Sequence, residues 1–176
     1  MTEKLPKNTV LVALSPGGLA LARTLKPLLP AAEIHGLTGR AETGADQVFA
    51  DVAEHLRGLF KQSRPIVGIC AAGILIRALG SVLDDKYRDP PVVALAEDGS
   101  AAVPLLGGHR GANRLAAEIA EGLGGIAAVT TAGDVAMGVA LDAPPEGYRL
   151  ANPGDAKAAM AAMLAGAGVS VVGENI

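Results

Sequence analysis

The chain has 176 residues, half of them apolar, and its 15 basic and 18 acidic side chains give a formal net charge of −3. This charge excludes a general attraction to nucleic acid or to an anionic membrane surface, so any anion site must be local. The single cysteine, Cys70, excludes an internal disulfide and any metal site built from several cysteines.

Strand-like and helix-like segments alternate along the chain. Apolar runs predict strands at residues 9–15, 33–37, 66–70, 92–96, 101–106, 126–131 and 169–172. Helical periodicity predicts helices at residues 19–29, 50–62, 74–83, 111–122 and 155–164. Pro16-Gly17-Gly18 is expected to turn the chain, and Glu97–Ser100 to close a β-hairpin. This order predicts an α/β sandwich whose mostly parallel sheet contains a hairpin insertion.

The domain division expected from this pattern is an α/β domain at residues 1–145, followed by residues 146–176. The second segment would close the first domain or begin another. The N-terminus lacks the apolar core of a signal peptide, and no apolar run is long enough to span a bilayer, which predicts a cytoplasmic protein. The chain ends at Ile176 without a polar tail, so we expect it to be part of a longer polypeptide.

The segment after the hairpin has the richest chemistry. Gly107 and Gly108 follow a strand, His109 and Arg110 come next, and a helix begins near Asn113. Glycines let a ligand approach the backbone, and a helix start attracts anions. We interpret His109 as a general acid–base, Arg110 as a clamp for a carboxylate and Asn113 as a hydrogen-bonding group. The structural alternative is that His109 caps its helix, Asn113 pairs locally and Arg110 is solvated.

A second polar segment is expected beside this histidine. A strand–helix–strand crossover makes its two strands parallel, so strands 101–106 and 126–131 should end at the same edge of the sheet. Thr130 and Thr131 would then supply neutral hydrogen bonds near the histidine, and Asp134 would orient its imidazole. Ligands of open α/β sheets bind beside such strand ends.

The hairpin divides the candidate residues between two edges. If the fourth predicted strand is parallel to the third, Glu97 and Asp98 lie at the edge opposite His109, together with the glycine-rich turns after the first and third strands. The loop at residues 84–89 would lie at the edge of His109. The sequence leaves two candidate clefts, of which the cleft at His109 has the richer chemistry.

Three other features receive structural interpretations. Pro16-Gly17-Gly18 matches no phosphate-loop pattern and is predicted to be a tight strand–helix turn. His35 and His55 stand alone, so surface or helix-face positions are expected and metal ligation is not. Cys70 lies in an apolar run, where a free cysteine usually behaves as a small buried hydrophobe.

Several motifs together resemble the N-terminal region of the CbiG family of cobalamin biosynthesis. In order and spacing they are Gly73–Ala78 (GILIRA), Asp85–Val93 (DKYRDPPVV), Glu97–Gly99 (EDG), Leu106–Asn113 (LGGHRGAN) and Val129–Ala132 (VTTA). The resemblance implies a Rossmann-like, three-layer N-terminal domain. It also implies a cobalt-precorrin-5A hydrolase, which opens a δ-lactone and releases a two-carbon fragment as acetaldehyde. Arg110 departs from the family pattern, where an apolar residue is expected.

The resemblance also suggests how the candidate residues would act. His109 would activate water, while a helix-start N–H group or a threonine hydroxyl would stabilise the oxyanion. The acetate and propionate arms of a corrinoid precursor would suit Arg110, Arg77 or Lys86. No cofactor is expected, because any cobalt would belong to the substrate.

Two other function classes remain open. One is a non-catalytic tetrapyrrole-binding module fused to a precorrin-3B C17-methyltransferase, as occurs for this family in some bacteria. The other is a generic anion- or nucleotide-binding α/β domain. A tetrapyrrole intermediate is the expected partner, nucleic acid and membrane are not, and a fused methyltransferase domain or a homo-oligomer is also compatible with the sequence.

Overall fold

The computed structural model describes residues 6–131 and 148–170. It contains two compact units, residues 1–129 and 130–176. In the second unit, the 3-10 turn η2 (Pro153–Asp155) leads into helix α6 (Ala156–Leu164), which agrees with the predicted helix at residues 155–164. The expected domain boundary at residue 145 lies outside the described residues, as does part of the expected strand at 169–172. Residues 169 and 170 are described and do not form a strand.

The first unit is built on a seven-stranded sheet in the order β3-β2-β1-β4-β5-β6-β7. The strands are β1 (Val10–Ala13), β2 (Glu33–Leu37), β3 (Gln47–Phe49), β4 (Ile66–Ile69), β5 (Val92–Leu95), β6 (Ala101–Leu106) and β7 (Ile126–Ala127). Strands β1 to β5 are parallel, β6 is antiparallel to β5, and β7 is parallel to β6. The structure therefore confirms the mostly parallel sheet with a hairpin insertion.

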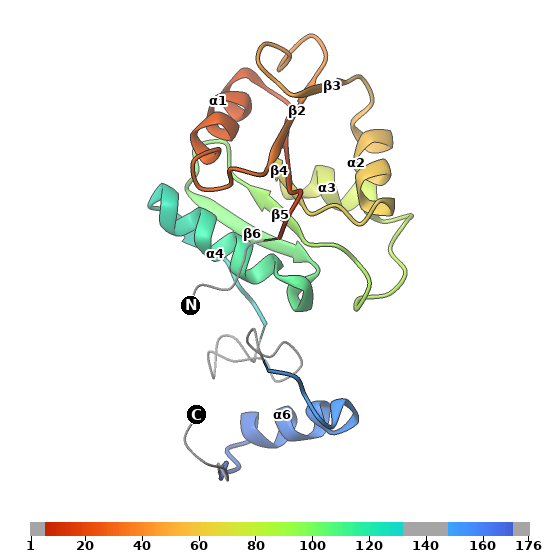
Figure 1. The fold of residues 1–176 in the computed structure, drawn as a ribbon, viewed down its shortest axis with the longest axis vertical. Helices are drawn as coiled ribbons and strands as arrows, with labels where there is room; N and C mark the ends of the chain where they lie inside the picture. The colour runs from red at the N-terminus through yellow and green to blue at the C-terminus, as the bar shows by residue number, and fades with distance from the viewer. Residues whose placement is uncertain (1–5, 132–147, 171–176) are drawn as a thin grey trace. The chain divides into compact units, whose positions relative to one another are not determined.

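Helices cover both faces of this sheet, as Figure 1 shows. They are α1 (Pro16–Leu25), α2 (Val52–Lys61), α3 (Ala72–Leu79) and α4 (Ala112–Leu123), the last preceded by the 3-10 turn η1 (Gly108–Arg110). Helices α1 and α4 pack on one face and α2 and α3 on the other, which gives two separate hydrophobic cores. Strands β1, β4 and β5 are buried along their whole length, as expected for parallel strands covered on both sides. The three-layer α/β sandwich is confirmed.

Helix α1 begins earlier than the sequence predicts. Pro16, Gly17 and Gly18 form its first turn rather than a separate loop. The side chain of Ser15 caps the helix by accepting a 2.9 Å hydrogen bond from the Gly18 N–H. Proline is well suited to the first helical position because its fixed φ is helical and its missing N–H has no intrahelical partner there. This capping outweighs the turn tendency of the two glycines.

Strand β7 is shorter than the predicted strand at residues 126–131. It pairs with β6 at Ala101 and Ala102, and the Ala128 N–H donates to the Ala102 carbonyl oxygen at 2.9 Å. Since alternate residues of β6 face β7, the next backbone N–H toward β7 would come from Pro104, which has none. The ladder therefore ends after two residues.

Strand β3 was not predicted. It has three residues, and among them only Phe49 is buried, so no apolar run or alternation marks it in the sequence. The Cys70 side chain is partly buried against the α2–α3 face, and burial raises the pKa of its thiol to about 11. This agrees with the prediction of an unreactive cysteine. No helix in the described part of the chain is long and apolar enough to cross a membrane.

Candidate functional site

The direction of β6 assigns the polar loops to two opposite edges of the sheet. Strand β5 is parallel to β4 and antiparallel to β6. The turn at Glu97–Ser100 therefore lies at the edge where β1 and β4 end, and the turn after β6 lies at the edge where β5 begins. This is the arrangement that the sequence predicts if the fourth strand is parallel to the third.

Gly107 opens the turn after β6 in a conformation that strongly favours glycine. Its φ is +70°, in the left-handed region, and a Cβ there would come within 2.7 Å of backbone atoms of Pro90 and Pro91. Gly111 closes the turn with a φ of +99°. Backbone hydrogen bonds of 2.9 and 3.1 Å to the Gly107 carbonyl oxygen, from Arg110 and Ala112, hold the turn together. The close approach to the start of β5 fixes this turn at the sheet edge.

His109 is the central residue of this turn, and only its backbone is described. Asn113 lies in the first turn of α4, and its carboxamide is 3.5–3.6 Å from where a Cβ on Gly108 would lie. The carboxamide therefore lies within van der Waals reach of the backbone of the turn. The N-terminus of α4 has no side-chain cap. The structure therefore brings Gly107, Gly108 and Asn113 together around the backbone of His109.

Arg110 joins the turn to the loop at residues 84–89. Its guanidinium donates a hydrogen bond to the Arg88 carbonyl oxygen. The same loop carries Lys86, whose ammonium lies 4.7 Å from the centroid of the Tyr87 ring. Two exposed cations are thus held at the edge of His109, as the sequence predicts for this loop.

Arg77 points elsewhere. It lies near the end of α3, but its guanidinium folds back and donates a 2.9 Å hydrogen bond to the Gly73 carbonyl oxygen. Gly73 is in the first turn of α3, which begins where β4 ends. The side chain of Arg77 is therefore directed toward the edge opposite His109, and the structure does not group it with Arg110.

The expected partners from the next strand remain predictions. Thr130 and Thr131 belong to the second compact unit of the chain, whereas His109 belongs to the first. Asp134 lies outside the described residues. Strand β7 is parallel to β6, as the crossover argument requires, which confirms the direction of β7.

The opposite edge contains a contact that the sequence did not reveal. The Glu97 carboxylate accepts hydrogen bonds from the Ser15 hydroxyl at 2.5 Å and the Gly18 N–H at 3.1 Å. This edge includes the switch point between β1 and β4, where open α/β sheets commonly bind ligands. Asp98 has the turn role that its sequence predicts, accepting from the N–H and the hydroxyl of Ser100.

His35 and His55 do not stand alone, contrary to the sequence interpretation. Nδ1 of His35 lies 2.9 Å from Nε2 of His55, and the side chain of His35 is completely buried in β2. The signal that could have placed His35 was its position inside a predicted strand rather than a loop. Its meeting with a helix 20 residues later is a tertiary contact with no local signature.

Comparisons with known proteins relate this chain to one family. Residues 54–134 match the family model for the cobalamin synthesis G N-terminal domain. The chain is 38% identical over 140 residues to the cobalt-precorrin-5A hydrolase of Salmonella typhimurium, covering 78% of this chain and 39% of the relative. It is 30% identical over 138 residues to the corresponding hydrolase of Priestia megaterium, covering 74% and 37%.

A solved structure shows the same fold. The cobalamin biosynthesis protein G homolog of Sulfolobus solfataricus superposes with a TM-score of 0.52 at 20% identity, covering 96% of this chain and 51% of that one. The chain spans less than two fifths of the length of the two curated relatives. The matched segment includes the loop at residues 84–89 and the turn that holds His109. This chain therefore carries the N-terminal domain of the cobalamin synthesis G family at residues 54–134.

Proposed function

We propose that this chain acts in cobalamin biosynthesis as the N-terminal part of a cobalt-precorrin-5A hydrolase. The reaction opens the δ-lactone of the macrocycle and releases acetaldehyde. The observation that carries the proposal is the turn from Gly107 to Gly111, which places His109 at a sheet edge within the segment that matches the family. Any cobalt belongs to the substrate, and the cytoplasm is the proposed location.

The roles follow from the chemistry of lactone opening. His109 accepts a proton from the attacking water. The uncapped start of α4 stabilises the oxyanion. Asn113 supplies a further neutral hydrogen bond to the substrate.

The charges at the two edges favour the edge of His109 for an anionic substrate. At the opposite edge, the Glu97 carboxylate already occupies the N-terminus of α1, so a substrate carboxylate would meet a like charge. At the edge of His109, Arg110 and Lys86 are exposed cations, with the Arg110 guanidinium donating to the Arg88 carbonyl oxygen and the Lys86 ammonium near the Tyr87 ring. The loop also carries Asp84, Asp85 and Asp89, so these two cations act locally. A corrinoid precursor with acetate and propionate arms suits this second arrangement. We assign Arg77 no direct contact in this site, because its guanidinium is turned toward Gly73.

Two results favour hydrolysis over the other function classes. Both curated relatives are named as cobalt-precorrin-5A hydrolases, which favours a catalytic role over a non-catalytic module fused to a methyltransferase. The α1 turn lacks a phosphate-loop pattern and is occupied by Glu97, which argues against a nucleotide site there. A rise in melting temperature with nucleotides but not with tetrapyrroles would reverse this preference.

The decisive experiment measures binding and acetaldehyde release separately. Cobalt-precorrin-5A is added to the wild-type chain, to His109→Ala and to Lys61→Ala, an exposed change on α2 that serves as the control. We expect His109→Ala to bind the substrate, detected by its absorbance change, without releasing acetaldehyde. Release at the wild-type rate by His109→Ala would overturn the assigned base. Binding without release by the unchanged chain would instead favour the non-catalytic module.

A further inference from the structure

A chain of polar side chains, centred on the buried His35, lies along β2, and three strands separate β2 from β6 in the sheet. His35 uses both ring nitrogens: Nδ1 is 2.9 Å from Nε2 of His55, and Nε2 is 3.1 Å from Oε2 of Glu33. Arg64 forms a 3.0 Å ion pair with Glu33 and also donates to the Asn8 carbonyl oxygen. The proposed hydrolase site uses none of these residues.

The hydrogen bonds fix which nitrogen of each ring carries a proton. Arg64 holds the pKa of Glu33 below its usual value, so Glu33 is a carboxylate and His35 Nε2–H donates to it. His35 Nδ1 is then an acceptor, and His55 Nε2–H donates to it. Burial lowers the pKa of His35 and lowers that of His55 to about 4, so both rings are neutral at pH 7.

This order of donors leaves Nδ1 of His55 with a free lone pair. No donor in the described parts of the chain bonds to it. The ring is also held in place by stacking on Phe49, with centroids 4.1 Å apart and planes 2° from parallel. His55 is therefore a fixed, neutral hydrogen-bond acceptor.

His55 lines a hollow of about 430 Å³ between α2 and the β2–β3 side of the sheet. Helix α2 lines the hollow with Glu54, His55, Gly58 and Leu59, and its capping residues Asp51 and Gln62 line it at the two ends. Asp51, His55, Gly58 and Gln62 follow helical spacing. A Cβ on Gly58 would meet no atom within 4 Å, so the space beside it is empty. Glycine inside a helix costs about 1 kcal/mol relative to alanine. The sequence thus leaves room at this position at the expense of helix stability.

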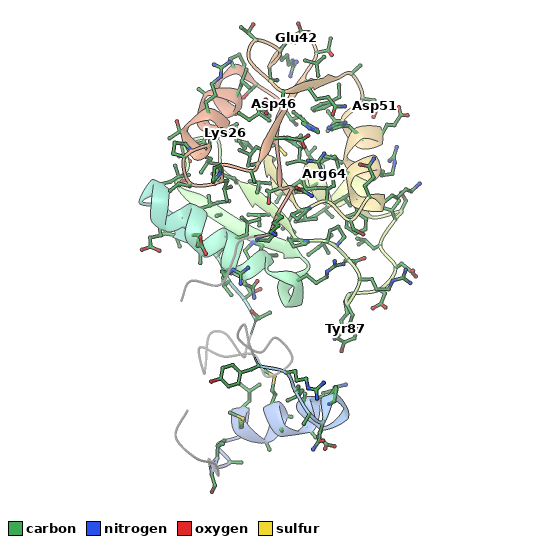
Figure 2. All side chains as sticks on the ribbon, viewed as in Figure 1. Lys26, Glu42, Asp46, Asp51, Arg64 and Tyr87 are labelled. Atoms are coloured by element: carbon green, nitrogen blue, oxygen red, sulfur yellow. The ribbon has the colours of Figure 1, made fainter. Side chains whose placement is uncertain are left out.

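The lining is rich in acceptors and negative charge. Asp51 and Glu54 both line the hollow, and neither forms an ion pair within residues 6–131. Asp51 caps the helix by accepting a 2.8 Å hydrogen bond from the Glu54 N–H, which uses one of its oxygens. Arg64, the cation of the lining, is committed to Glu33 and to a backbone carbonyl. Figure 2 labels Asp51 at the start of α2 and Arg64 on the chain that follows the helix.

We propose that this hollow binds a small organic cation with N–H donors, of the ammonium or guanidinium class. The ligand donates to Nδ1 of His55 and pairs with the carboxylates of Asp51 and Glu54. A metal ion is the less suitable occupant, because the described residues contain no group of three side chains placed to ligate one. The site is independent of the proposed hydrolase function, and neither depends on the other.

Histidine ¹⁵N NMR of the chain at pH 7 tests the proposal directly. The probe is agmatine, which carries an ammonium and a guanidinium. Tetramethylammonium, a cation without N–H, and succinate, a dianion, are the controls. We expect His55 in the Nε2–H tautomer and a saturable shift of its Nδ1 resonance with agmatine alone. An unshifted Nδ1, or an equal response to tetramethylammonium or succinate, overturns the proposal.

Gly58 supplies a matched pair of variants. Gly58→Leu fills the hollow without changing any charge and should weaken agmatine binding by about tenfold or more. Gly58→Ala adds one methyl group, stabilises the helix and should keep the affinity within about twofold of wild type. Glu54→Gln, which removes a charge without adding bulk, should also weaken binding and serves if Gly58→Leu fails to fold. Wild-type affinity in Glu54→Gln, or in a folded Gly58→Leu, overturns the proposal.

Discussion

The Ser15 hydroxyl donates a 2.5 Å hydrogen bond to Oε1 of Glu97, although the two residues are 82 positions apart. The same oxygen accepts the Gly18 N–H at 3.1 Å. A hairpin that the sequence marks only as a turn therefore also closes the N-terminus of α1. Its negative charge lies at the positive end of the helix dipole.

Glu97→Gln should lower the free energy of unfolding by about 0.5–1 kcal/mol, because it removes the charge at this helix end while keeping an acceptor. Urea denaturation measures the change. Glu121→Gln is the control, since it removes an exposed carboxylate from the last turn of α4, where the dipole disfavours an acid. Equal losses in the two variants would contradict the assigned role of Glu97.

Gly107→Ala should destabilise the chain more than Gly124→Ala. Both glycines have positive φ, +70° and +68°, so both variants carry the left-handed cost of about 1–2 kcal/mol. Only at Gly107 does the new methyl group meet backbone, that of Pro90 and Pro91. The difference between the urea midpoints of the two variants measures the effect of this contact. Equal midpoints would show that the backbone before β5 shifts to accommodate the methyl group at little cost.

The His35–His55 pair should make the fold sensitive to mild acid. The unfolded chain binds protons on both histidines as the pH falls through about 6.5. The folded chain binds these protons only at lower pH, because desolvation lowers the pKa of both rings, that of His55 to about 4. The free energy of unfolding should therefore fall as the pH drops from about 6.5 toward 4.

His55→Gln tests this dependence, because the amide keeps a donor for His35 but does not titrate. The variant should lose part of the decrease in stability when urea midpoints are measured across the same pH window. A pH dependence identical to that of wild type would assign the acid sensitivity to other groups.

Arg110→Leu should make the loop at residues 84–89 open more often, with little change in the free energy of unfolding of the whole domain. The guanidinium bond to the Arg88 carbonyl oxygen is lost, while the backbone bonds of the turn remain. Trypsin should then cut after Lys86 or Arg88 several times faster, as mass spectrometry of the fragments would show. Lys61→Ala is the control, and unchanged cleavage rates would mean that the loop is held by other contacts.

The sequence predicts the layers of the fold and the edge at which each loop lies. Long apolar runs mark the buried strands, and one conditional argument about strand direction correctly separates Glu97 from His109. Segment ends were less predictable. The early start of α1 depends on Ser15 and Pro16, and the early end of β7 on Pro104 in its neighbour.

Contacts between distant segments could not be predicted. Nothing local in the sequence joins Ser15 to Glu97, or His35 to His55. The direction of the Arg77 side chain was equally unpredictable. Its position near the end of α3 does not indicate that the guanidinium folds back to the Gly73 carbonyl oxygen. The glycine positions around His109 were informative because they constrain the backbone itself.

The partly buried Cys70 also makes the protein convenient to label. With its thiol pKa raised to about 11, very little reactive thiolate exists at neutral pH. A new surface cysteine, such as Lys61→Cys at the end of α2, would therefore react selectively with a maleimide dye. A second at Ser100 would lie ~20 Å from the histidine turn, across the six residues of β6. Fluorescence could then follow each edge of the sheet without first removing the native cysteine.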